Sequence, residues 1–227
     1  GKGTVSQAIK HRLSAPIDAP TEVLAFTDTR RPVIFWNITN KCNLTCGHCY
    51  INASPDAERP NEQNLEEGKA FIDDVAEVGV PLLLFTGGEP LISKDFWKLA
   101  EYAKGKGLRT VISTNGVLIT KDVAKRLQDV GIQYVGVSLD GFDPATHDHI
   151  RGMKGAWQGA IDGLKNCVEI GLKSGIRITS HKSNYKEVPD IIDMALEMGV
   201  PRFCLYWLVP SGRGLEGYLD NQLSPEE

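Results

Sequence analysis

Short apolar runs and longer stretches of helical periodicity alternate along most of the chain. The apolar runs predict strands at residues 32–38, 81–85, 109–113, 134–138, 176–179 and 203–207. Many of these runs are apolar on both faces, which is typical of parallel strands covered by helices. The sequence therefore predicts repeated strand–helix units around a parallel sheet or barrel.

The stretches between the strands carry apolar residues at spacings of three and four, which predict amphipathic helices. We expect helices at 65–78, at 96–103 with Ser93 as cap, from Thr120 to Leu127, at 156–170 and at 187–198. Gly171 and Gly199 occupy the positions where helices commonly stop. In such folds, functional side chains gather at the carboxyl ends of the strands.

Composition narrows the class of protein. The 227 residues suit one domain, or one domain with a fragment, and 41% are hydrophobic while 24% are charged. A net charge of −4 argues against a general nucleic-acid binder and against binding to an anionic membrane. No apolar run approaches the roughly 18 residues that span a bilayer, and no secretory signal is evident. We therefore expect a cytoplasmic protein that binds neither nucleic acid nor a membrane.

The two ends differ from the middle. Residues 1–32 lack the strand–helix pattern and are interpreted as an N-terminal extension, and the sequence opens at Gly1 rather than methionine. Residues 33–227 form the predicted core. The final residues Ser224-Pro225-Glu226-Glu227 read as the cap and first turn of a helix. We therefore expect the core to be cut before a C-terminal domain.

Three of the five cysteines lie within eight residues, just beyond the first predicted strand. Cys42, Cys46 and Cys49 have C-x3-C-x2-C spacing, and thiolates are suitable ligands for iron–sulfur clusters or zinc. Three cysteines can hold three irons of a [4Fe–4S] cube and leave the fourth iron open. A Cys3His zinc site using His48 is the alternative. Cys167 and Cys204 stand apart and are expected to pack in the core.

This spacing resembles the cluster motif of the radical S-adenosylmethionine (SAM) superfamily, with His48 at the aromatic-type position before the last cysteine. The resemblance extends to Gly87-Gly88-Glu89-Pro90, which follows the second predicted strand and is similar to the GGEP element of that family. It implies a partial (β/α)6 barrel with parallel strands, and a SAM amino group held by the Gly87–Pro90 backbone and Glu89. Glycines allow close backbone approach, and a carboxylate pairs with an ammonium.

Residues at the ends of further predicted strands are similar to those that form the SAM pocket in that family. These residues, as the resemblance implies, are Ser113 and Asn115 after the third strand, Ser138 and Asp140 after the fourth, and Leu208 after the sixth, near adenine. Arg151 and Arg177 are candidates for the SAM carboxylate, and Arg177 is preferred because an arginine within a strand needs a partner. His11, His147, His149 and His181 show no ligand pattern and are expected to be solvated or structural.

The resemblance also implies the chemistry. SAM chelates the open iron, an electron from the reduced cluster cleaves its C–S bond, and the resulting 5′-deoxyadenosyl radical abstracts hydrogen from the substrate. The cofactor carries out the difficult chemistry, so no side-chain acid or base is assigned as catalytic. A flavodoxin or ferredoxin is the expected electron donor.

The segment after the sixth strand suggests a substrate. Its Ser211-Gly212-Arg213-Gly214 sequence resembles radical SAM enzymes of alternative heme and heme d1 biosynthesis, such as the didecarboxysiroheme deacetylases. This implies removal or modification of side chains on a siroheme-derived tetrapyrrole. Related peptide-modifying enzymes carry a cysteine-rich C-terminal domain of the SPASM type, so a further cluster is expected only in a missing C-terminal segment. A peptide-modifying enzyme and a zinc-binding interaction module remain the alternatives.

Overall fold

The computed structural model describes residues 31–58, 62–224 and 226. The predicted N-terminal extension therefore lies almost entirely outside the described residues. The helix predicted to start at Ser224 also falls on positions that are only partly described.

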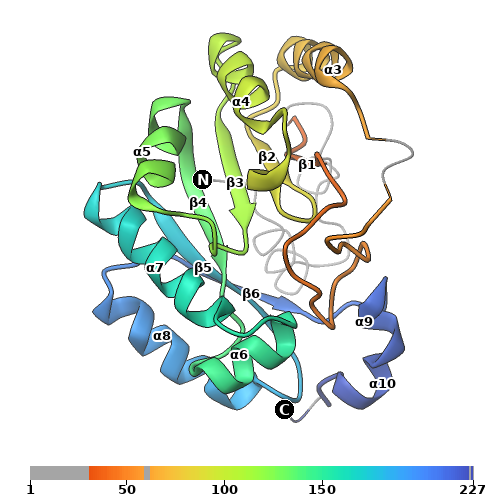
Figure 1. The fold of residues 1–227 in the computed structure, drawn as a ribbon, viewed down its shortest axis with the longest axis vertical. Helices are drawn as coiled ribbons and strands as arrows, with labels where there is room; N and C mark the ends of the chain where they lie inside the picture. Colours follow the sequence, from red (N-terminus) through yellow and green to blue (C-terminus); the bar gives the residue numbers. More distant parts are fainter. Residues whose placement is uncertain (1–30, 59–61, 225, 227) are drawn as a thin grey trace, which may run out of the picture.

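Within the described residues, six parallel strands form one sheet whose spatial order follows the sequence order. The strands are β1 (Ile34–Asn37), β2 (Leu83–Thr86), β3 (Thr110–Thr114), β4 (Ile132–Ser138), β5 (Ser174–Ser180) and β6 (Phe203–Trp207). The sheet curls so that β1 and β6 are its free edges (Figure 1). This confirms the predicted partial (β/α)6 barrel and all six predicted strands.

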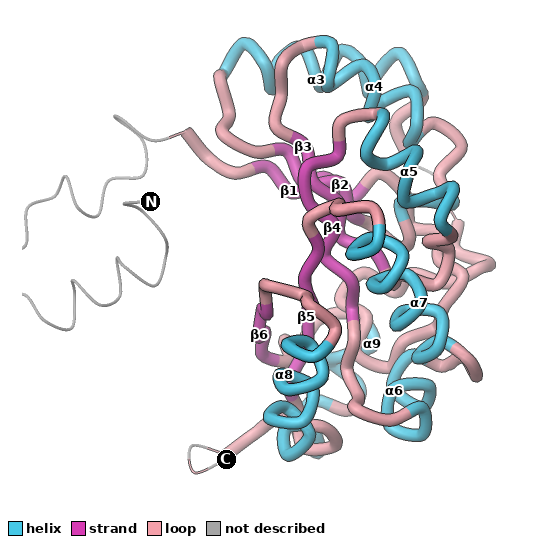
Figure 2. Tube along the Cα trace, turned by 90° about the vertical axis from the view of Figure 1, so that its left-hand side faces the viewer, coloured by secondary structure: helices cyan, strands magenta, loops and turns pink. Residues whose placement is uncertain are grey.

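Helices follow the strands and cover the outer side of the sheet, where α3, α4, α5 and α7 lie along one side of the strands (Figure 2). The longer helices are α3 (Leu65–Val78), α4 (Phe96–Gly105), α5 (Lys121–Asp129), α6 (Pro144–Arg151), α7 (Ala156–Glu169) and α8 (Val188–Glu197). Short helices are α9 (Arg213–Glu216) and α10 (Tyr218–Asn221), with 3-10 turns η1 (Pro90–Ile92) and η2 (Tyr185–Glu187).

Helix ends follow local sequence chemistry, with one correction. Thr120 caps α5, since its Oγ1 accepts a hydrogen bond from the Val123 amide at 3.2 Å. Gly171 and Gly199 have φ angles of 72° and 70° just beyond α7 and α8, as a helix stop requires. The prediction that Ser93 caps α4 is wrong. Ser93 closes η1 by donating its amide to Pro90 O at 3.0 Å, and Asp95 stands at the N-cap.

Helix α6 was not predicted from the sequence. Two of its three buried side chains, His147 and Arg151, are polar or charged, so apolar periodicity is weak. Local signals were nevertheless present. Pro144 stands in the first turn, Asp143 Oδ1 accepts from the Thr146 amide at 2.9 Å, and Gly152 ends the helix at a φ of 67°.

The core lies between the helices and the outer face of the sheet, and includes the fully buried side chains of Ile72, Phe85, Phe96, Ile112 and Leu164. Aromatic rings such as Phe85 and Phe96 pack edge to face at 5.5 Å. This packing fixes the strands, and with them the loops at their carboxyl ends. Among the described helices, none is both long and apolar enough to cross a membrane.

Candidate functional site

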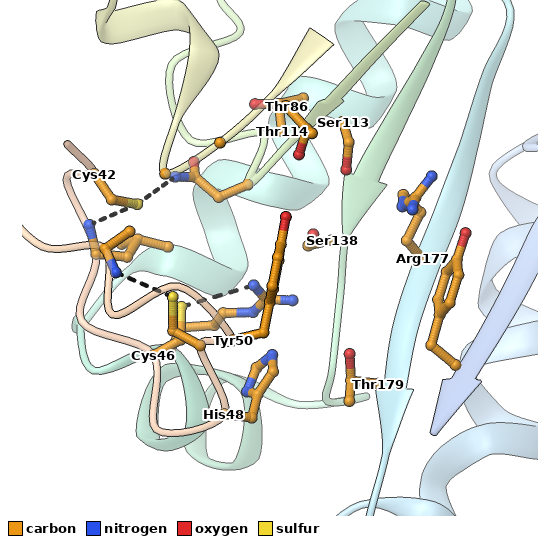
Figure 3. Close-up of a pocket in the computed structure, with 18 of the residues that line it drawn as sticks. Cys42, Cys46, His48, Tyr50, Thr86, Ser113, Thr114, Ser138, Arg177 and Thr179 are labelled. Atoms are coloured by element: carbon orange, nitrogen blue, oxygen red, sulfur yellow. Dashed lines mark hydrogen bonds between the residues drawn. The ribbon is translucent and has the colours of Figure 1, made fainter. Parts of the chain in front are cut away.

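A cavity of about 360 Å³ opens at the carboxyl ends of the strands, inside the curl of the sheet (Figure 3). Each strand contributes to its wall, either directly or through the loop that follows it. The lining includes Phe35, Cys42, Cys46, His48, Cys49, Tyr50, Thr86, Gly87, Gly88, Ser113, Thr114, Asn115, Ser138, Arg151, Arg177, Thr179, Tyr206, Trp207 and Arg213.

The cysteine loop after β1 brings Cys42, Cys46 and Cys49 to one side of this cavity. Each sulfur accepts a hydrogen bond, from the amide of Leu44 at 3.4 Å, from Arg151 Nη1 at 3.7 Å and from the amide of Ala53 at 3.3 Å, respectively. Asn115 Nδ2 adds a second donor to Cys42 Sγ at 3.9 Å. Donors aimed at sulfur stabilise thiolate ligands, so the residues fit a cluster held by three cysteines.

The zinc alternative would require His48 and the three sulfurs to surround one ion. Among the described residues, no three His, Cys, Asp or Glu side chains are grouped so that they could hold a single metal ion. His48 directs Nε2 toward Asp140 Oδ2 at 3.4 Å instead of joining the sulfurs. Thiolates that bind separate irons of a cube do not need to converge on one point, whereas a tetrahedral zinc site does.

The cysteines are buried, which affects their ionisation. Burial, as the largest cause, raises the pKa of Cys42 to about 11, and it also raises the pKa of Cys46 above its usual value. Without a bound cation both side chains are therefore neutral thiols near pH 7. A bound iron would supply the positive charge that a buried thiolate needs.

The segment after β6 holds the cysteine loop in place. Arg213 Nε donates to Cys46 O at 2.8 Å, and Arg213 Nη2 donates to Ala53 O at 2.7 Å. Gly212 has a φ of 56°, and a Cβ there would lie 2.3 Å from Cys49 O. The Ser-Gly-Arg-Gly sequence thus positions the cysteine loop, a role that sequence reasoning missed because it needs two segments distant in the chain.

Gly87 and Gly88 lie against the start of the cysteine loop. The Gly88 amide donates to Thr39 O at 2.7 Å, and the Glu89 amide donates to Lys41 O at 2.8 Å. A Cβ at Gly88 would lie 2.1 Å from Lys41 O, so only glycine allows this approach. The backbone of the two glycines reaches the cavity beside the cysteines.

Replacing Gly88 with alanine is expected to separate the two loops and to lower the free energy of unfolding by about 2–3 kcal/mol, because the clash is with backbone. Gly47→Ala is the matched control on the cysteine loop itself, since a Cβ there meets nothing within 4 Å. Gly47→Ala should change the free energy of unfolding by no more than about 0.5 kcal/mol. Urea unfolding of the cluster-free proteins checks both, and equal midpoints would contradict the packing argument.

Glu89 lies beneath the cavity and does not line it. Its carboxylate is fully buried and accepts hydrogen bonds from Thr114 Oγ1 at 2.9 Å, the Asn115 amide at 2.8 Å and the Leu91 amide at 3.1 Å. Pro90 is buried in η1. Glu89 therefore ties the loop after β2 to the end of β3, and the protein already occupies its carboxylate oxygens.

Burial raises the pKa of Glu89 to about 7, although the surrounding donors favour its charged form. The folded protein then holds a proton that the unfolded chain loses near pH 4.5. Stability from this group is complete at low pH and is lost as pH rises through 7. Relative to the Glu89→Gln variant, the free energy of unfolding of the wild type should fall by about 3 kcal/mol between pH 4.5 and 7. Urea unfolding across that range checks this, and parallel pH profiles would refute it.

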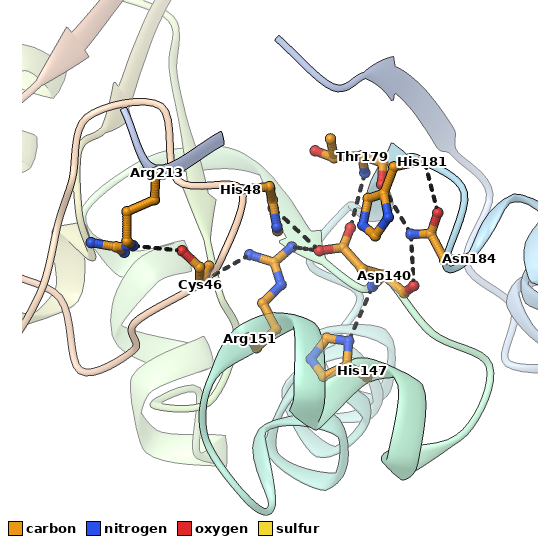
Figure 4. Close-up of polar contacts among 9 residues, drawn as sticks. All are labelled: Cys46, His48, Asp140, His147, Arg151, Thr179, His181, Asn184 and Arg213. Atoms are coloured by element: carbon orange, nitrogen blue, oxygen red, sulfur yellow. Dashed lines mark hydrogen bonds and ion pairs between the residues drawn. The ribbon is translucent and has the colours of Figure 1, made fainter. Parts of the chain in front are cut away.

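A buried polar network lies behind the cysteines (Figure 4). Arg151 Nη2 lies 2.6 Å from Asp140 Oδ2, while Asp140 Oδ1 accepts from the Thr179 amide at 2.9 Å. The Asp140 amide donates to His147 Nδ1 at 3.0 Å. Burial alone would raise the pKa of Asp140, but the Arg151 charge in particular keeps it below its usual range. Asp140 is fully buried and does not line the cavity, so it acts on the site through Arg151.

The remaining predicted residues divide between two cavities. Ser113, Asn115, Ser138 and Arg177 line the main cavity with the cysteines. Leu208 lines a second cavity of about 290 Å³ on the other side of His48. The structure thus brings most of the predicted set together but places Leu208 apart from the cysteines.

The histidines outside the cysteine loop were predicted to be solvated or structural, and two of them are structural. His147 and His181 are buried, and burial lowers the pKa of His147 to about 4. Both are structural parts of the network around Asp140, whereas His149 is exposed and His11 lies outside the described residues. Cys167 is fully buried on α7, as predicted, and Cys204 is half-buried on β6.

Comparison with known proteins places these features in a family. The Radical SAM superfamily matches residues 36–204. Fe-coproporphyrin III synthase of Methanosarcina barkeri is 50% identical over 208 residues, which cover 92% of this chain and 51% of that protein. AdoMet-dependent heme synthase of the same organism is 37% identical over 90% of this chain and 57% of its own length. Pre-heme d1 synthase of Dinoroseobacter shibae is 36% identical, and the match covers 89% of this chain and 50% of that protein.

Solved structures agree on the fold. Streptococcus suis SuiB bound to S-adenosylmethionine superimposes with a TM-score of 0.67 at 22% identity, covering 78% of this chain and 40% of SuiB. The chain spans about half the length of the curated relatives it matches. The similarity to heme and heme d1 proteins confirms the subgroup that the sequence motifs indicated. On the family match and these relatives, the chain belongs to the radical SAM superfamily.

Proposed function

We propose that this protein cleaves SAM reductively at a [4Fe–4S] cluster and modifies side chains of a siroheme-derived tetrapyrrole in heme or heme d1 biosynthesis. The observation that carries the proposal is the cavity itself. Cys42 and Cys46 lie on one side of it and Arg177 on the other (Figure 3), and Cys49 and the aromatic side chains of Phe35, Tyr206 and Trp207 also line it. The 50% identity to Fe-coproporphyrin III synthase supports the substrate class.

The chain's own residues would hold both cofactors. Cys42, Cys46 and Cys49 would bind three irons, and the Gly87–Gly88 backbone would receive the SAM amino group beside them. When bound, the reduced cluster and SAM supply one-electron cleavage of a C–S bond and abstraction of a hydrogen atom from substrate. The protein orients these groups and excludes water.

Of the two arginines considered for the SAM carboxylate, Arg151 is the better placed. It contacts Cys46 Sγ at 3.7 Å, and a carboxylate that chelates the open iron must lie close to the cysteines. Arg177 lies across the cavity from them (Figure 3). Ser113 and Ser138, on the ends of β3 and β4, remain proposed contacts for the rest of SAM.

The mouth of the cavity suits a large planar substrate. Phe35 on β1 and Trp207 on β6 line it from the two edges of the sheet, and they are 62% and 63% exposed. Exposed aromatic side chains at a cavity mouth are typical of binding sites for flat apolar ligands. A flavodoxin or ferredoxin as electron donor and a cytoplasmic location belong to the same proposal.

The test is anaerobic formation of 5′-deoxyadenosine by the reconstituted, reduced protein with SAM, with and without Fe-coproporphyrin III or didecarboxysiroheme. We expect formation to rise several-fold with one macrocycle, together with a mass change in that macrocycle. SAM cleavage that no macrocycle stimulates would contradict the tetrapyrrole assignment. It would favour the peptide-modifying alternative, since mycofactocin maturase MftC of Mycolicibacterium smegmatis is 32% identical over 85% of the chain.

A further inference from the structure

Arg177 is one of three arginines that line the cavity, and it differs from the other two in its partners. Its side chain projects from β5 into the cavity, and no ion pair to it occurs among the described residues. The two other arginines of the lining are already engaged. Arg151 pairs with Asp140, and Arg213 donates to two backbone carbonyls. A half-buried guanidinium without an anion indicates a ligand that supplies one.

The surroundings of Arg177 hold it in one place. Its guanidinium carbon lies 4.7 Å from the centre of the Tyr206 ring on β6. Gly136 on β4 leaves room for its stem, because a Cβ there would lie 2.6 Å from Arg177 Cδ. Ser138 is its register partner on β4 and lines the same cavity. A fixed, planar guanidinium recognises a carboxylate through two parallel hydrogen bonds.

Under the proposed function, a carboxylate that reaches Arg177 could come from SAM or from the substrate. The SAM carboxylate is expected at the open iron, on the side of the cavity where Arg151 contacts Cys46. Arg177 lies on the opposite side of the cavity (Figure 3), over the Tyr206 ring, and Trp207 lines the same cavity. A planar ligand resting on these rings would bring its peripheral side chains close to the guanidinium.

Resting on the proposed function, we infer that Arg177 binds a carboxylate side chain of the macrocyclic substrate and so fixes which edge of the macrocycle faces the cysteines. Arg177 is then a substrate-binding, specificity-determining residue, and Tyr206 holds its guanidinium in position. The ligand class is a planar tetrapyrrole that carries acetate or propionate groups.

The test is a binding titration of the cluster-loaded protein with Fe-coproporphyrin III and with its methyl ester, followed by Soret absorbance. The wild type should bind the acid about 10- to 100-fold more tightly than the ester, since a hydrogen bond to a charged group is lost. Arg177→Gln should weaken binding of the acid by a similar factor and leave ester binding unchanged, and Arg177→Lys should restore part of the loss. The SAM dissociation constant should stay within about twofold.

Arg126→Gln is the matched control, because Arg126 also stacks on an aromatic ring, Trp97 at 4.1 Å, but lies outside the cavity. Arg126→Gln should change neither the affinity for Fe-coproporphyrin III nor the affinity for SAM. Weaker SAM binding with unchanged macrocycle binding in Arg177→Gln would overturn the inference and assign Arg177 to SAM. Equal wild-type affinity for acid and ester would overturn it even if the variant fails to fold. A wild type that binds SAM and neither macrocycle would refute the proposed function itself.

Discussion

Cys46→Ala is expected to abolish cluster binding, so that reconstituted protein lacks the absorbance near 400 nm and forms no 5′-deoxyadenosine above background. The physical reason is that a [4Fe–4S] cube needs a thiolate on each of the three irons it does not leave open. Cys46 is also the sulfur that receives Arg151 at 3.7 Å, and its backbone oxygen anchors Arg213. Iron and sulfide analysis after anaerobic reconstitution measures the effect.

The remaining cysteines provide controls. Cys167→Ala and Cys204→Ser should retain the full iron content, because Cys167 is buried within the core on α7 and Cys204 lies on β6. A cluster of unchanged iron content in Cys46→Ala would contradict the ligand assignment. Loss of the cluster in Cys204→Ser would show that the set of ligands is not confined to the loop after β1.

Asp140→Asn is expected to lower the free energy of unfolding by about 3–5 kcal/mol, because it leaves the Arg151 guanidinium buried without its counter-charge. The side chains of Asp140 and Arg151 are only 0% and 10% exposed, and their closest atoms are 2.6 Å apart. Asparagine keeps the size of the side chain, so the loss is electrostatic rather than one of packing. Urea unfolding of cluster-free protein at pH 7 measures it.

An exposed ion pair offers the comparison. Asp129 pairs with Lys125 one helical turn away on α5, and both side chains are more than half exposed. Asp129→Asn should therefore change stability by no more than about 0.5 kcal/mol. If Asp140→Asn and Asp129→Asn changed the free energy of unfolding by similar amounts, the ion pair between Asp140 and Arg151 would not stabilise the fold. That result would contradict the inference that Asp140 holds Arg151 beside Cys46.

The inner strands β2 to β5 could be predicted because burial on both faces leaves a strong local signal. The run from Leu82 to Phe85 is apolar throughout, and Gly79 and Gly87 lie close to its two ends. Helix α6 escaped prediction since it buries His147 and Arg151 rather than apolar residues, so its periodicity does not show in hydrophobicity. The cap of α4 was misplaced because Pro90 begins a separate 3-10 turn.

The site was predictable where one motif lies in one loop. The three cysteines and the two glycines after β2 meet as expected, since adjacent parallel strands bring their carboxyl ends together. The roles of Arg213, Asp140 and Glu89 could not be read from spacing. Each depends on contacts between segments far apart in sequence, such as the hydrogen bond from Arg213 to Cys46. The proposed preference for Arg151 over Arg177 likewise rests on their places in the cavity.

We propose that the cysteine loop holds a cluster with one iron open to SAM. The test is the electron paramagnetic resonance spectrum of the reduced, reconstituted protein, recorded before and after SAM is added. We predict a four-iron cluster signal whose g values shift when SAM is added, because SAM binds to the cluster itself. A spectrum that SAM leaves unchanged, in protein with full iron content, would contradict the account.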